Sequence, residues 1–216
     1  MTGADERHGL AVIRALGSKG LAIFAAGVDA GRLGFRSRYV RGSCCYPSLT
    51  VEAPDTQGFV SAIREAVTRH RIPWIFPVTE STVVALDRSR AAFEGLARIA
   101  LPASAALRVA LDKESTRALA SSLGIPVPRS CLPRSAAEAL SFAREVGFPL
   151  VMKPRGPAEG RLTGGLGFKV RYARCEDDLR AALRPFDARG EFPMLQEYCP
   201  GVGVAQSGIV ANGEIR

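Results

Sequence analysis

The spacing of apolar residues divides the chain into two halves with different patterns. In the first half, apolar positions recur every three or four residues in three segments, which predicts amphipathic helices. Short and almost wholly apolar runs lie between them, which predicts buried strands. The helices are expected at 6–17, 57–71 and 80–93, and the strands at 20–26, 73–78 and 97–101. Strands that alternate with helices of this length indicate an α/β fold with a doubly wound parallel sheet.

The pattern changes at residue 112. Asp112 is a plausible N-cap for a helix, and Gly124 is a typical stop signal after its end. Further helices are expected at 135–146 and 176–184, and strands at 150–154, 167–172 and 192–198. This order predicts a small α+β unit with antiparallel strands. The domain boundary is therefore placed near residue 111, which gives domains 1–111 and 112–216.

Both ends of the chain carry incomplete patterns. A doubly wound half normally opens on a buried strand, whereas residues 1–4 look like the tail of a strand and its turn. Near the other end, Asn212-Gly213 between apolar runs predicts a β-hairpin whose return strand has only three residues. The patterns lead us to expect a missing first strand and an incomplete second domain, truncated at its C-terminus.

Composition narrows the class of protein. No apolar run approaches the roughly 18–20 residues that span a bilayer, so no membrane partner is expected. The five cysteines contain no CxxC and are odd in number, which fits neither a zinc site nor a disulfide framework. We therefore expect a reducing, cytoplasmic setting.

The net charge of +8 comes mostly from arginines that are spread along the whole chain. This charge fits a solvated surface, and it fits a basic cleft for a small anion equally well. A nucleic-acid-binding module is the weaker interpretation, because no recognised motif accompanies the charge.

One stretch suggests phosphate chemistry. Residues 150–169 read LVMKPRGPAEGRLTGGLGFK, in which an apolar run ends at Lys153 and a glycine-rich loop follows. Free backbone N–H groups in such a loop can surround phosphate oxygens. The P-loop motif GxxxxGK[ST] and the dinucleotide fingerprint GxGxxG are both absent. The second absence disfavours a nicotinamide-dependent oxidoreductase.

Dispersed residues in a fixed order suit a nucleoside triphosphate instead. Lys113 comes first, then Lys153, the glycine loop 160–167, and Gln196-Glu197-Tyr198 in LQEYCPG. Two ammonium groups would neutralise phosphate charge, and the loop would wrap the terminal phosphates. A carboxylate at a strand edge could accept the adenine amino group, while apolar neighbours sandwich the base.

This order resembles the ATP-grasp superfamily, and in particular its carbamoyl-phosphate-synthase-like and carboxylate–amine ligase branch. The resemblance rests on DK…LASSLGIPVP, PLVMKPR with its glycine loop, and LQEYCPG, and it runs over nearly the whole chain. SRYV at 37–40 and WIFPVTE at 74–80 resemble the domain that precedes such ligase domains. The resemblance therefore implies a pre-ATP-grasp domain followed by part of the ATP-grasp domain.

The resemblance also implies a reaction and a set of binding residues. ATP would phosphorylate a small-molecule carboxylate, and an amine would attack the resulting acylphosphate. Lys113 and Lys153 would contact the α- and β-phosphates, and Glu197 the adenine N6, with backbone contacts from Tyr198 and Cys199. Gly164, Gly165 and Gly167 would close over the β- and γ-phosphates, and Gln196 would complete the cleft wall.

The sequence departs from the family pattern in three places. The loop carries the extra residues GPAEGRLT, and Val202 and Val204 stand where family members often place an acidic residue. The family's magnesium ligands, including a Glu-x-Asn pair, lie beyond residue 216, so Mg²⁺ would be held outside this sequence. Because phosphoryl transfer depends on such ions, the chain alone is expected to be inactive.

Structural roles remain open for the same residues. Lys153 could be a snorkelling side chain, Lys113 a helix-surface lysine and Glu197 an exposed strand residue. Glu80, after a strand, suits either a ligand site or a helix start. The alternative to a ligase is a non-catalytic module of the same fold that binds nucleotide weakly or not at all. The sequence does not indicate an oligomeric state.

Overall fold

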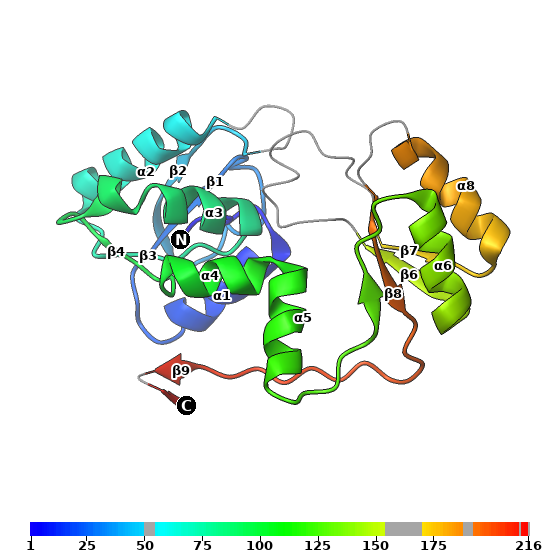
Figure 1. The fold of residues 1–216 in the computed structure, drawn as a ribbon. Helices are drawn as coiled ribbons and strands as arrows, with labels where there is room; N and C mark the ends of the chain where they lie inside the picture. The colour runs from blue at the N-terminus through cyan, green and yellow to red at the C-terminus, as the bar shows by residue number, and fades with distance from the viewer. Residues whose placement is uncertain (50–54, 154–169, 188–191, 212, 216) are drawn as a thin grey trace. The chain divides into compact units, whose positions relative to one another are not determined.

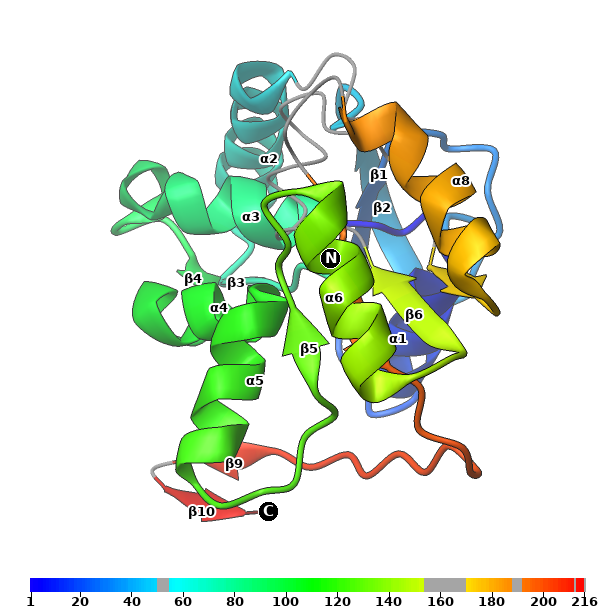
Figure 2. The same cartoon turned by 45° about the vertical axis from the view of Figure 1, so that its right-hand side comes forward.

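The computed structural model describes residues 1–49, 55–153, 170–187, 192–211 and 213–215. These residues divide into two compact units, one from Met1 to Pro126 and the other beginning at Val127. Figures 1 and 2 show the elements of both units in two views. The domain boundary expected near residue 111 falls inside the first unit, between two of its helices, and stays a prediction.

The first unit alternates helices with short parallel strands. Strands β1 and β2 pair in parallel, and so do β3 and β4. The elements are α1 (Arg7–Gly17), β1 (Ile23–Gly27), β2 (Val40–Cys45), α2 (Thr56–His70), β3 (Trp74–Ile75), α3 (Glu80–Arg88), a 3-10 helix η1 (Arg90–Phe93), β4 (Arg98–Ile99), α4 (Ser104–Leu111) and α5 (Lys113–Ser122). The α/β character is as expected, but the parallel strands described in this unit form two separate pairs rather than one doubly wound sheet.

Helix α2 anchors the core of this unit. The carboxylate of Asp55 accepts a hydrogen bond from the backbone N–H of Gly58 and so caps the helix. Phe59, Ile63 and Val67 then recur every four residues on one face and are buried. They belong to a core cluster with residues of β1, β3, α3 and η1.

A single helix expected over 80–93 is wrong. The helix α3 ends at Arg88, because Ser89 has φ −113° and ψ 21°, outside helical geometry. The chain then continues as the separate 3-10 helix η1. Strand β2 and helix α4 were not predicted at all.

The second unit is built on a four-stranded antiparallel sheet, as predicted. Its strand order is β5-β8-β6-β7. The elements are β5 (Ser130–Cys131), α6 (Ala136–Val146), β6 (Leu150–Lys153), β7 (Arg171–Ala173), α8 (Glu176–Asp187) and β8 (Met194–Glu197). A separate antiparallel pair, β9 (Val210–Ala211) with β10 (Glu214–Ile215), follows in the same unit and confirms the hairpin predicted at 212–213.

Helices α6 and α8 cover one face of the four-stranded sheet (Figures 1 and 2). Leu150 and Met152 of β6 and Leu195 of β8 point to this face and pack against apolar residues of the two helices. Leu179 and Leu183 of α8 are also almost completely buried. Because side chains alternate along a strand, the neighbouring residues of β6 and β8 lie on the opposite face.

Candidate nucleotide site

The face of the second sheet that points away from α6 and α8 carries the residues of interest. Val151 pairs with Gln196, and Lys153 pairs with Met194, so these four side chains share that face. Val151 and Met194 are buried, with 8% and 3% of their surface exposed. The two polar residues therefore stand beside an apolar floor.

Lys153 and Gln196 meet on this floor. The Nζ atom of Lys153 donates a hydrogen bond to Oε1 of Gln196, although the two residues are 43 positions apart in the chain. Lys153 is the last residue of β6 and is partly buried. The strand end and the amide together fix the ammonium group, which retains donors for other acceptors.

Two tyrosine rings lie at the edge of the same face. Tyr172 of β7 pairs with Val151, and its ring meets that of Tyr198 edge-on, with centroids 6.1 Å apart and planes at 75°. The side chains are 57% and 42% exposed. Partly exposed aromatic rings next to an apolar floor are suited to contact with a flat, apolar ring.

The carboxylate of Glu197 already has a partner. Its Oε2 atom accepts hydrogen bonds from the backbone N–H and from Nε of Arg129, both at 3.1 Å. In return, the backbone N–H of Glu197 donates to the carbonyl of Arg129 at 2.8 Å. These bonds from Arg129 lower the pKa of Glu197 and keep the carboxylate charged. An adenine amino group would have to share this carboxylate with Arg129, and the expected contact between Glu197 and adenine stays a prediction.

Ser130 and Arg129 were missed by sequence reasoning. Ser130 pairs with Gln196, so it lies on the same face as Lys153. Its hydroxyl oxygen is buried and has no hydrogen-bond partner among the residues that the structure describes. The segment 125–130 (IPVPRS) gives no hint of these contacts, since they depend on the pairing of β5 with β8.

The remaining predicted residues are less closely defined. Lys113 is exposed at the start of α5 in the first unit, where Asp112 caps the helix by accepting from the backbone N–H of Ser115 at 2.7 Å. The hydrogen bonds from Ser115 lower the pKa of Asp112. Cys199 is exposed with a free thiol. Gly164, Gly165 and Gly167 lie outside the described residues, and their roles, like that of Lys113, stay predictions.

Two further findings concern partners of the described residues. No three of their His, Cys, Asp and Glu side chains gather in a way that could hold a metal ion. In the same ranges, no helix has the length and apolarity needed to cross a bilayer.

Comparison with known proteins finds partial sequence matches and a similar fold. No family model matches the sequence. The chain is 48% identical over 46 residues to D-alanine–D-alanine ligase of Pseudomonas fluorescens, covering 21% of this chain and 14% of that enzyme. It is 45% identical over 56 residues to the carbamoyl phosphate synthase large chain of Thermus thermophilus, covering 26% of this chain and 5% of that one.

A solved structure is similar over most of the chain. The complex of biotin carboxylase with β,γ-ATP from Campylobacter jejuni superposes with a TM-score of 0.61 at 20% identity and covers 89% of this chain. The match covers 43% of that protein, so this chain spans less than half the length of each of the three proteins it is compared with. At this identity the likeness concerns the fold.

Proposed function

We propose, from the similarity of the fold to biotin carboxylase and of short segments to D-alanine–D-alanine ligase and the carbamoyl phosphate synthase large chain, that this chain is the ATP-binding part of an ATP-grasp ligase. In this proposal ATP activates a small-molecule carboxylate as an acylphosphate, and an amine then attacks the acyl carbon and displaces phosphate. The free thiols of all five cysteines are compatible with a cytoplasmic enzyme.

The contact between Lys153 and Gln196 carries the proposal. An ammonium group held at a strand end beside an apolar floor is suited to bind phosphate oxygens while the base lies on Val151 and Met194. Tyr172 and Tyr198 would contact the edge or face of the base. The orphan hydroxyl of Ser130 offers one further polar group on the same face.

The pair of Arg129 and Glu197 would position the end of β8. Because the carboxylate is bound by Arg129, we propose that it holds the backbone of Tyr198 and Cys199 in place, where N–H and C=O groups can read the ring. Lys113 and the glycines 164, 165 and 167 would add contacts to the phosphates. Bound Mg²⁺ would offset phosphate charge during transfer, and we expect its ligands to lie outside this sequence.

A non-catalytic module of the same fold is the second candidate. One observation favours it: the Glu197 carboxylate is already engaged by Arg129. Such a module would bind nucleotide weakly or not at all.

Calorimetric titration of the purified chain with ATP, ADP and NAD, with and without Mg²⁺, separates these candidates. We expect ATP and ADP to bind, and we expect Lys153→Met to weaken ATP binding by about tenfold or more, as the loss of a charged hydrogen bond does. Lys19→Met, at an exposed turn, is the matched control and should leave the affinity unchanged.

Three outcomes would decide against the ligase proposal or its central residue. Binding of NAD without ATP would refute the ligase assignment. An unchanged affinity of Lys153→Met would remove Lys153 from the site. A folded wild-type chain that binds no nucleotide at millimolar concentration would favour the non-catalytic module.

A further inference from the structure

Two buried hydroxyl groups have no hydrogen-bond partner among the residues that the structure describes. One belongs to Thr2 in the first unit, and the other belongs to Ser130 in the second. A buried hydroxyl of this kind lowers stability, because it has lost its hydrogen bonds to water and gained none within the protein. Such groups are few in native proteins, and they mark places of bound water, strain or function.

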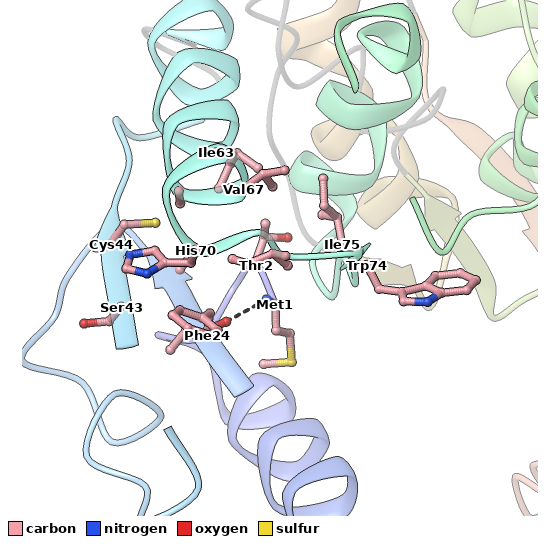
Figure 3. Close-up of a pocket in the computed structure, with 14 residues that line it drawn as sticks. Met1, Thr2, Phe24, Ser43, Cys44, Ile63, Val67, His70, Trp74 and Ile75 are labelled. Atoms are coloured by element: carbon pink, nitrogen blue, oxygen red, sulfur yellow. Dashed lines mark hydrogen bonds between the residues drawn. The ribbon is translucent and has the colours of Figure 1, made fainter. Parts of the chain in front are cut away.

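The hydroxyl of Thr2 belongs to a side chain that lines a small space within the first unit. Figure 3 shows Thr2 together with Ile63, Val67 and Ile75, which also line this space. Its volume is about 30 Å³, the share of one water molecule in the liquid. A water molecule is therefore enough to satisfy the hydroxyl of Thr2.

Ser130 lies on the same face of the four-stranded sheet as Lys153, directly opposite Gln196. The N–H of Glu197 donates to the carbonyl of Arg129 at 2.8 Å, so this ladder bond lies beside the pair of Ser130 and Gln196 rather than within it. In antiparallel sheets, pairs of this kind bring their side chains closest together. The Ser130 hydroxyl is therefore a close neighbour of the Gln196 amide.

The amide oxygen of Gln196 accepts from a charged donor. Lys153 pairs with Met194 and so stands diagonally across from Gln196, and its Nζ atom donates to Oε1. An ammonium group makes a stronger hydrogen bond than a neutral hydroxyl does. Of the two donors on either side of Gln196, Lys153 from β6 thus holds the oxygen, and Ser130 from β5 does not.

We propose that Ser130 is a positioning residue for the phosphate site and acts through a change of partner at Gln196. When phosphate oxygens bind the ammonium group of Lys153, its hydrogen bond to Oε1 of Gln196 is released. The Ser130 hydroxyl then donates to that oxygen in its place. Only hydrogen bonds are exchanged, and the proton stays on the serine oxygen. The inference rests on the proposed function, because it requires a phosphate at Lys153.

The exchange accounts for a buried hydroxyl without a partner in the ligand-free chain. Before binding, the hydroxyl lowers stability. After binding, it replaces the partner that Gln196 loses, so that the movement of Lys153 toward phosphate costs less free energy. Ser130 thus favours nucleotide binding while it disfavours the ligand-free fold, which is the opposite of what a purely structural residue does.

The first test measures nucleotide binding by the full chain. In calorimetric titration with ATP and Mg²⁺, Ser130→Ala should weaken binding by about threefold to tenfold, the loss expected for one neutral hydrogen bond. Ser130→Thr keeps the hydroxyl and should stay within about twofold of the wild-type affinity. Ser141→Ala makes the same change at an exposed position of α6 and should leave the affinity unchanged.

The second test measures thermal stability without nucleotide, so it does not depend on ATP binding. Ser130→Ala should raise the melting temperature of the wild-type chain by about 2 °C, because it removes a hydroxyl that has no partner. In the Lys153→Met chain, Oε1 of Gln196 is already free to accept from the hydroxyl. Ser130→Ala should therefore lower the melting temperature of that chain by about 2 °C.

The outcomes separate this inference from the proposed function. If Lys153→Met weakens ATP binding and Ser130→Ala does not, the proposed function stands and the role of Ser130 is wrong. An equal loss of affinity in Ser130→Thr and Ser130→Ala, or a shift of the melting temperature in the same direction in both chains, would also overturn the exchange. If the wild-type chain binds no ATP, the proposed function fails, and the role of Ser130 at a phosphate site fails with it.

Discussion

The two units differ in how their strands are paired. In the second unit, strand β6 has an antiparallel partner on both sides, and α6 and α8 cover one of its faces. In the first unit, the parallel pairs are linked by residues that include the buried chain terminus. A strand that is paired on both sides can hold the side chain of Lys153 in one position. In the first unit, burial of the charged Met1 ammonium group instead lowers the stability of the fold. The comparison teaches that pairing on both sides holds the end of β6 in place in the second unit, whereas the first unit carries the cost of a buried amine.

The largest expected effect separates the two faces of the second sheet. Leu195 is completely buried beneath α6 and α8, so Leu195→Ala should lower the free energy of unfolding by about 2–5 kcal/mol. Tyr172→Ala, on the other face and 57% exposed, is the matched control and should cost less than about 1 kcal/mol. Urea denaturation measures both. Equal losses would mean that the two faces are equally important for folding.

The second effect concerns the buried terminus of the first unit. The amine has a pKa of about 6 in the folded chain against an ordinary value of 8.0, so between these values the unfolded chain binds more protons. Stability should therefore rise as the pH increases from 6 to 8, by about 2–3 kcal/mol in total. The cost of burying the charge is fully present below pH 6 and absent above pH 8.

Nα-acetylation provides the baseline for this pH effect. The acetylated chain keeps every other titratable group, so the difference between its stability profile and that of the free-amine chain isolates the Met1 amine. Intact mass must first confirm that Met1 is present. Identical profiles between pH 6 and 8 would contradict the burial of the ammonium group.

Local signals allowed much of the fold to be predicted. The superfamily resemblance is confirmed by the comparisons. The helices expected at 57–71, 112–123 and 135–146 appear as α2, α5 and α6, and each of their ends lies within one residue of the expected position. Capping residues mark these helices directly. Strand β2 was missed because VRGSCC has a weak apolar pattern, and its place depends on pairing with β1.

Two of the candidate site residues could be brought together from their order along the chain, although their role stays a prediction. The resemblance selected Lys153 and Gln196, and the antiparallel pairing of β6 with β8 brings them together. The hydrogen bonds from Arg129 to Glu197 could not be predicted, because they depend on the register between β5 and β8. An arginine in a chain with many scattered arginines gives no signal by itself.

Helix caps offer an effect of intermediate size in both units. Thr79 caps α3 by accepting from the N–H of Thr82 at 3.3 Å, and Ser135 caps α6 by accepting from the N–H of Glu138 at 3.1 Å. Thr79→Ala and Ser135→Ala should each lower the free energy of unfolding by about 1 kcal/mol. Thr79→Ser and Ser135→Thr keep the acceptor and should restore most of this loss in chemical denaturation. A difference of several kcal/mol between the two alanine variants would show that one of these helices has another role.

The smallest effect lies on the surface of α2. Glu65 and Arg69 form an ion pair of 2.7 Å with the acidic residue one turn before the basic one, the favourable orientation in a helix. Both side chains are about two-thirds exposed, so Arg69→Gln should cost only about 0.3–0.5 kcal/mol, and less at 1 M NaCl. A larger, salt-independent loss in denaturant titrations would contradict a solvated pair. If the loss is as small as expected, exposed ion pairs contribute too little free energy to explain the difference in strand pairing between the two units. That difference then follows from backbone hydrogen bonds and buried side chains.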